Sequence, residues 1–170
     1  MDATALLPFF SHGASDSNVD VRLACLKAAT QFLAVTGPLP DKSHQTLIPL
    51  LLNILPPIIS DPSHEDGAVE AIGHFISLGE THPKIFSSVL PTLVAFMCAQ
   101  MKNDSLEDGT RQICLEMLLT LTECAPGMMR RCPSFGENVI PICLDWMAEI
   151  EDEKCWYESL NVYFIFITDG

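Results

Sequence analysis

The chain has 170 residues, of which 48 % are hydrophobic and 18 % charged, a composition that favours a packed core and argues against intrinsic disorder. Its 22 Asp and Glu outnumber 9 Lys and Arg, and the net charge of −13 disfavours nucleic acid and anionic membranes as partners. The same charge favours basic partners, although an acidic surface also serves simply to keep an apolar repeat protein in solution.

Apolar periodicity and turn residues predict a succession of helices along the chain. We expect them at residues 3–12, 19–35, 43–59, 64–79, 84–101, 106–124 and 135–150. The turn Asn103-Asp104-Ser105 is expected to cap the helix that follows it. On helix 19–35, spacings of three and four residues predict a buried stripe of Val21, Ala24, Cys25, Ala28, Phe32 and Val35.

An aliphatic residue followed by proline recurs at intervals of roughly forty to fifty residues. The pairs are Leu7-Pro8, Ile48-Pro49, Leu90-Pro91 and Ile140-Pro141. Such a period is typical of stacked helical hairpins, each with a proline-bearing first helix and a second helix. A proline inside a helix bends it, whereas a proline at the first helical position costs little. For Pro49 and Pro91, the helix-forming residues upstream favour a bend.

Acidic residues and an arginine open successive second helices, as in Asp20-Val21-Arg22 and Asp108-Gly109-Thr110-Arg111, and these units resemble HEAT repeats. The sequence therefore predicts an all-α fold, a HEAT-repeat superhelix of antiparallel helix pairs. The expected repeats are residues 1–36, 41–80, 83–125 and 126–158, and an atypical tail follows at residues 159–170. Its apolar, β-prone run 160–167 either caps the open end of the last repeat or stays exposed and prone to aggregation.

Several other classes find no support in the sequence. Seven scattered cysteines without a CxxC pair indicate a reducing compartment rather than a disulfide framework or a zinc site. No signal peptide and no membrane span are expected. Because no nucleotide-binding, nucleophile-elbow or metalloprotease motif occurs, we predict no enzyme activity, no catalytic residue, no metal and no cofactor. The basic island Met128-Met129-Arg130-Arg131 is expected to cap a helix end rather than to bind phosphate.

Four stretches of the chain carry a more specific resemblance. They are Leu106-Glu107-Asp108-Gly109-Thr110-Arg111, Thr120-Leu121-Thr122-Glu123, Ala125-Pro126-Gly127-Met128-Met129-Arg130-Arg131, and the acidic run Glu149-Ile150-Glu151-Asp152-Glu153 with Trp156-Tyr157. On these residues the chain resembles the importin-β (karyopherin-β) family, and within it the importin-5 branch. The resemblance covers residues 5–160 and is strongest over residues 105–158.

This resemblance implies a nuclear transport receptor that shuttles between cytoplasm and nucleus. Receptors of the family carry cargo with basic nuclear-localisation signals, contact nucleoporins at the pore and release cargo when GTP-bound Ran engages. The chain would supply about four of roughly twenty repeats, without the family's N-terminal Ran-binding repeats. Two alternative hypotheses remain: a HEAT-repeat scaffold or adaptor without transport activity, and a truncated fragment that does not transport.

Carboxylates are the candidate contacts for basic cargo, because a negatively charged lining attracts lysine-rich segments and raises their association rate. On the second helices of the second and third hairpins these are Asp66, Glu70, Glu107, Asp108, Glu116 and Glu123. A second group combines acids with tryptophans, which together can hold a lysine stem and its ammonium: Asp145, Trp146, Glu149, Glu151, Asp152, Glu153 and Trp156. The alternative for each is an ordinary solvated helix face or a charged linker.

Overall fold

The computed structural model of the chain describes residues 6–39 and 44–148. Within these residues the regular elements are α1 (Leu7–Ala14), α2 (Val19–Thr36), α3 (His44–Leu52), α4 (Leu55–Ile59), η2 (Pro62–His64), α5 (Glu65–Thr81), η3 (Pro83–Phe86), α6 (Leu90–Met101), α7 (Asp108–Cys124), α8 (Pro126–Met129) and α9 (Pro133–Ala148). All of them are helical, η2 and η3 being 3₁₀ turns, and no strand occurs in the described part. The predicted all-α class is confirmed.

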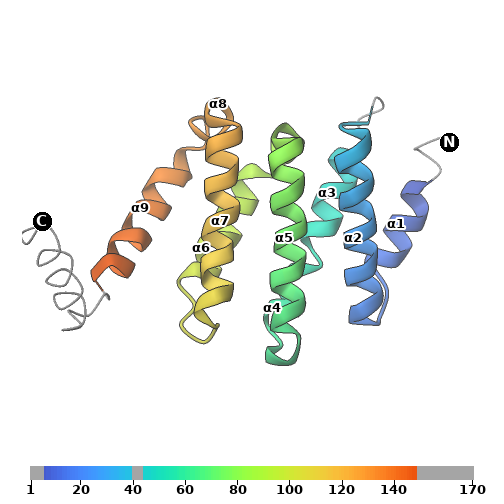
Figure 1. Ribbon diagram of the computed structural model, residues 1–170, viewed down its shortest axis with the longest axis horizontal. Helices are drawn as coiled ribbons and strands as arrows, with labels where there is room; N and C mark the ends of the chain where they lie inside the picture. Colours follow the sequence, from blue (N-terminus) through green and yellow to red (C-terminus); the bar gives the residue numbers. More distant parts are fainter. Residues whose placement is uncertain (1–5, 40–43, 149–170) are drawn as a thin grey trace, which may run out of the picture.

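The helices form two layers that advance along the long axis of the molecule (Figure 1). The long helices α2, α5 and α7 lie side by side in the front layer, and α5 packs against both of the others. Behind them, α1 packs on α2, α4 on α5 and α6 on α7, and α9 extends the row from α6. This stack of helix pairs is the predicted α-solenoid.

One continuous apolar core runs between the two layers. It extends from Phe10 in α1 to Ile142 in α9. Near its middle, the fully buried rings of Phe75 and Phe86 meet edge to face with their centroids 6.1 Å apart. Because each layer has only one apolar face, neither layer could bury its residues without the other.

The rear layer is divided into short helices between residues 44 and 101, whereas the front helices run without interruption. The predicted helix 43–59 is two helices, α3 and α4, with a turn at Asn53 and Ile54 between them. At that turn the amide of Ile54 donates to the carbonyl of Leu51, three residues back, instead of continuing the α-helical ladder. The predicted helix 84–101 is also divided, because η3 ends at Phe86 and α6 begins only at Leu90.

The four repeated prolines do not share one position in their helices. Pro49 and Pro141 lie inside α3 and α9. Pro8 and Pro91 lie in the first turns of α1 and α6, where a missing amide leaves no hydrogen bond unmade. The predicted bend at Pro91 is therefore wrong, since α6 begins only at Leu90 and residues 87–89 before it form a turn.

The bounds of α2 agree with the prediction to one residue, but its predicted buried face is wrong. Val21 and Val35 of the predicted stripe are 41 % and 88 % exposed. The buried residues are Cys25, Leu26, Ala29, Thr30 and Leu33, of which only Cys25 was expected. Apolar and small residues occur on every side of α2, so spacings of three and four fit more than one face, and packing against the rear layer selects among them.

Neighbouring pairs are also joined by polar contacts at the helix ends. Gly37 ends α2 with a φ of 71°, and the ring Nε2 of His82, just after α5, lies 3.1 Å from the carbonyl oxygen of Ala34. At the start of α7 the amide of Glu107 donates to Oε1 of Glu65 in α5, at 2.8 Å. Asn103 forms the predicted turn by accepting from Ser105, but it does not cap α7 as expected.

Candidate partner-binding face

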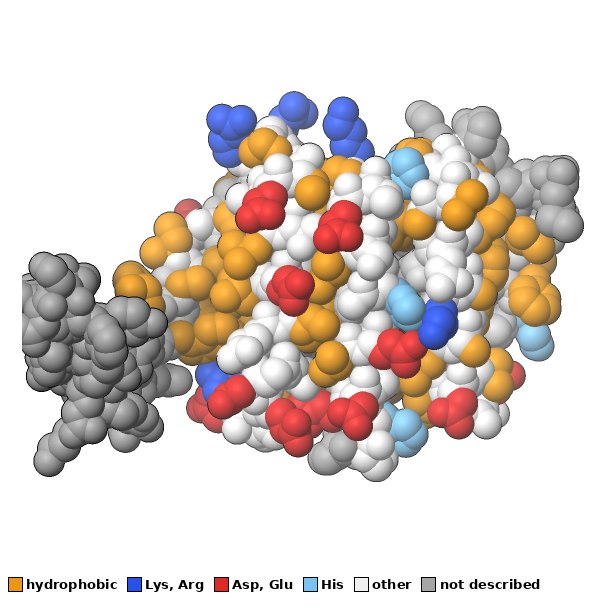
Figure 2. Space-filling model, viewed as in Figure 1, with side chains coloured by type: hydrophobic (Ala, Val, Ile, Leu, Met, Phe, Trp, Pro, Cys, Tyr) orange, Lys and Arg blue, Asp and Glu red, His pale blue; other side chains and the backbone are white. Residues whose placement is uncertain are grey.

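The exposed side of α2, α5 and α7, called here the front face, carries several of the predicted acidic residues (Figure 2). Glu116 and Glu123 are exposed and lie two helical turns apart on α7. Within the described residues, neither has a Lys or Arg within ion-pair distance. Their carboxylates are therefore available to a positively charged partner.

A second group of acids gathers where α5 and α7 begin. Asp66, Glu107 and Asp108 are exposed there, and the hydrogen bond from the Glu107 amide to Glu65 joins the two helix starts. Arg111 neutralises part of this group, because its guanidinium lies 3.4 Å from Asp108 and 3.6 Å from Asp104. The structure thus brings Glu107, Asp108 and, from the neighbouring helix, Asp66 to one end of the front face.

Glu70 already has a cation within the chain. Its Oε1 lies 3.0 Å from Nζ of Lys27 in α2. Nε2 of His74 lies 3.4 Å from the same oxygen, without hydrogen-bond geometry. The hydrogen bond from Lys27 is the main cause that holds the pKa of Glu70 below its ordinary value of 4.5. A lysine of a partner would have to displace Lys27 to reach this carboxylate.

Trp146 is likewise engaged by a residue of the chain itself. It is partly buried, and the guanidinium carbon of Arg111 lies 5.2 Å from the centre of its ring. Asp145 is exposed beside it on α9. The predicted cradle for a partner's lysine thus holds the chain's own arginine at Trp146. The other predicted members, Glu149, Glu151, Asp152, Glu153 and Trp156, lie outside the described residues.

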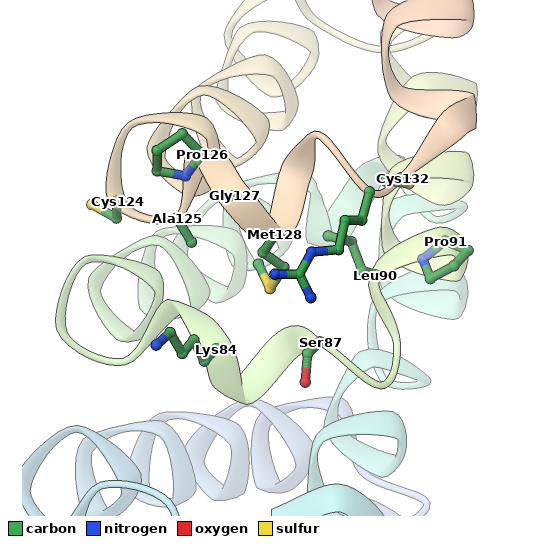
Figure 3. A pocket seen from close by; sticks show the side chains of 11 residues that line it. Lys84, Ser87, Leu90, Pro91, Cys124, Ala125, Pro126, Gly127, Met128 and Cys132 are labelled. Atoms are coloured by element: carbon green, nitrogen blue, oxygen red, sulfur yellow. The ribbon is translucent and has the colours of Figure 1, made fainter.

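A separate pocket of about 670 Å³ opens between η3 and the segment that follows α7 (Figure 3). Lys84 and Ser87 line it from one side, and Met128 and Arg131 from the other. Leu90 and Pro91 of α6 also line it. Lys84 and Arg131 are exposed, so the pocket combines an apolar lining with positive charge.

Sequence reasoning did not find this pocket. The island at residues 128–131 was recognised, and its predicted capping role is seen at Arg130, whose Nε donates to the carbonyl of Pro126. No local pattern, however, links that island to Lys84, which the stacking of successive pairs brings to the same hollow. A single basic residue after Pro83 carries no signal of its own.

Within residues 6–39 and 44–148, no three His, Cys, Asp or Glu side chains come together in a way that could hold a metal ion. No helix in the same part of the chain is long and apolar enough to cross a membrane.

Two family models match most of the chain. Residues 2–96 match a family model described as IPO5-like, TPR repeats, and residues 103–163 match one described as importin repeat. Importin subunit beta-3 of Saccharomyces cerevisiae is 30 % identical over 166 residues, which are 94 % of this chain and 15 % of the relative.

Solved structures of a karyopherin are also similar to this chain. The karyopherin Kap121p bound to the SUMO protease Ulp1p is 28 % identical, with a TM-score of 0.76 over 90 % of this chain and 15 % of that one. Kap121p bound to Nup53p superimposes with a TM-score of 0.74 and the same coverage. The chain therefore spans about 15 % of the length of these relatives.

Proposed function

Because the chain belongs to the importin-β family of nuclear transport receptors, as its sequence motifs predicted, we propose that its front face binds basic nuclear-localisation segments of cargo. The observation that carries this proposal is a pair of exposed carboxylates on α7, Glu116 and Glu123, that have no Lys or Arg partner among the described residues. The acids at the starts of α5 and α7 extend the same charge along the face.

A lysine-rich segment in an extended conformation is the ligand that suits this arrangement. Its ammonium groups would meet carboxylates on successive helices, and the negative field of the chain would speed the encounter. Each contact is exposed to solvent and worth little alone, so we expect an affinity on the order of micromolar or weaker that falls as salt rises.

The wider transport cycle belongs to the same proposal. We expect the described repeats to act within a longer receptor that shuttles between cytoplasm and nucleus and that also meets Ran and nucleoporins. Structures of the relative Kap121p have been solved in separate complexes, one with Ulp1p and one with Nup53p. The division into repeats at residues 1–36, 41–80, 83–125 and 126–158 remains a prediction.

Fluorescence anisotropy with a labelled lysine-rich localisation peptide tests the proposal. At low salt we expect saturable binding, and Glu116→Gln with Glu123→Gln should weaken it by roughly 3- to 10-fold. The matched control is Glu137→Gln, which removes an exposed carboxylate from α9 rather than from the front face.

A second variant addresses the residues beyond α9. Replacing Glu149, Glu151, Asp152 and Glu153 by their amides is predicted to weaken binding of the same peptide more than the Glu116 and Glu123 substitutions do. Absence of any binding at low salt, or an equal loss in the Glu137 control, would contradict cargo recognition by the front face.

A further inference from the structure

One edge of this acidic molecule is positively charged. Lys84, Arg130 and Arg131, called here the basic rim, are all exposed. Lys27 and Arg111 elsewhere are held by carboxylates, at 3.0 Å and 3.4 Å respectively. No Asp or Glu of residues 6–39 or 44–148 lies within ion-pair distance of any member of the basic rim. Figure 2 shows a cluster of Lys and Arg side chains along the upper edge of the front view.

The pocket beside this rim is lined by both apolar and polar side chains. Lys84 and Arg131 belong to the pocket wall, as do Leu90, Pro91 and Met128. In Figure 3, Lys84 and Ser87 lie below the hollow, while Leu90 and Met128 border it from above. A volume of about 670 Å³ falls within the range of sites that accept a side chain or a small ligand.

These features select among possible ligands. A nucleic acid draws its affinity from many neutralised phosphates, whereas the basic rim offers only three cations. A bare inorganic anion would use the cations and leave the apolar lining unoccupied. A peptide that places carboxylates on both sides of one large apolar side chain would use both.

We propose that the pocket between η3 and α8 binds an acidic peptide segment with an apolar anchor residue. The anchor lies against Leu90, Pro91 and Met128, and the flanking carboxylates meet Lys84 and Arg131. The site has the opposite charge preference to the front face. It gives the chain a second class of partner, independent of basic cargo.

The probe is a short fluorescein-labelled peptide with one phenylalanine between two pairs of glutamates. We expect saturable binding that weakens with salt, and a loss of at least about 5-fold for Lys84→Glu or Arg131→Glu. The matched control is Lys102→Glu, an exposed lysine at the far end of α6, which should change the affinity less than about 2-fold. Circular dichroism of each variant checks that the fold is retained.

A companion peptide with serine in place of phenylalanine isolates the apolar anchor and should bind more weakly. As an independent readout, Cys124 lines the pocket and is exposed, so the phenylalanine peptide should slow its alkylation as followed by mass spectrometry. Three results would each overturn the proposal: no binding at low salt, equal losses in the Lys84 and Lys102 variants, or equal affinity for the two peptides. None of them bears on the front face, so the two proposals fail separately.

Discussion

Arg111 connects three elements through one side chain that is only 13 % exposed. Its Nε donates to the carbonyl of Met101 at the end of α6, its guanidinium faces Asp104 and Asp108, and it lies over Trp146 of α9. Residues that bridge elements in this way stabilise a solenoid at the interfaces between successive pairs.

Arg111→Ala is therefore expected to lower the free energy of unfolding by about 1–3 kcal/mol, since a charged hydrogen bond and a cation–π contact are lost together. Urea denaturation followed by circular dichroism measures the change. Arg130→Ala, which removes an exposed arginine, should stay within about 0.5 kcal/mol. If the two variants proved alike, the bridge would have no energetic role.

Glu70 gives a prediction about pH. Its folded pKa is below 4.5, chiefly because Lys27 donates a hydrogen bond to it. The pair therefore stabilises the folded state above about pH 4.5, the ordinary pKa of a glutamate, and this stabilisation is lost as the pH falls through the lower pKa of the folded state. Glu70→Gln should flatten the acid limb of the stability curve without changing its shape near neutrality, as measured by thermal unfolding in a series of buffers. An unchanged acid limb would show that the Lys27 contact does not persist in solution.

At the scale of one element, α5 contains two glycines that should respond differently to substitution by alanine. A Cβ on Gly67 would lie 2.8 Å from Cδ1 of Leu23 in α2, so the two front helices approach closely there. A Cβ on Gly73 would meet nothing within 4 Å.

Gly73→Ala should raise the free energy of unfolding by about 0.5–1 kcal/mol, because alanine is the better helix former. Gly67→Ala should raise the free energy of unfolding by less, or lower it by up to about 1 kcal/mol, because Leu23 must move to make room for the new methyl group. Urea denaturation of the two single variants compares them directly. A larger gain at Gly67 than at Gly73 would contradict the close packing of α2 on α5.

The same scale shows what the sequence could and could not predict. The order of the longer helices followed from periodicity, and α2 and α7 were placed within one or two residues, but the short helix α8 was not expected. The breaks at Asn53 and before Leu90 were not predicted, because apolar residues continue on both sides of each turn. The engagement of Glu70 and Trp146 was also missed, since Lys27 and Arg111 reach them only through stacking.

The last described helix presents an apolar stripe that its counterpart in the preceding pair buries. Counted from the repeated proline, Leu90, Val94 and Met97 of α6 correspond to Ile140, Leu144 and Met147 of α9. The α6 residues are 5 %, 0 % and 0 % exposed beneath α7, whereas those of α9 are 59 %, 59 % and 67 % exposed. In the preceding pair, residues 102–107 lead from α6 into α7, which covers the α6 stripe.

We therefore expect the apolar residues that follow, including the run 160–167, to cover this stripe. Leu144→Lys should then lower the free energy of unfolding of the full chain by about 1–3 kcal/mol. Val35→Lys, on an 88 % exposed residue of α2, should have little effect. Sedimentation measurements decide whether a second copy covers the stripe instead, in which case the wild type dimerises and the Leu144 variant does not.

Across the whole molecule, the two proposed sites have opposite charge. Carboxylates occupy the front face and the starts of α5 and α7, while the basic rim lies at the other end of the front helices, where α7 leads into α8 (Figure 2). Glu123 is next to the pocket residue Cys124, but Glu116 lies about 12 Å farther along α7, beyond the Debye length of about 8 Å at physiological salt, so most of the acidic face interacts only weakly with the basic rim. Binding at one site should therefore leave the affinity of the other nearly unchanged.

Titrating the acidic peptide in the presence of saturating localisation peptide tests this independence. At physiological salt we expect dissociation constants that agree within about 2-fold, and by linkage the reverse titration must give the same factor. The two peptides attract each other in solution, so each titration needs a control without protein. A mutual weakening of about 10-fold or more would mean that both peptides occupy one surface, and the division into an acidic face and a basic pocket would then be wrong.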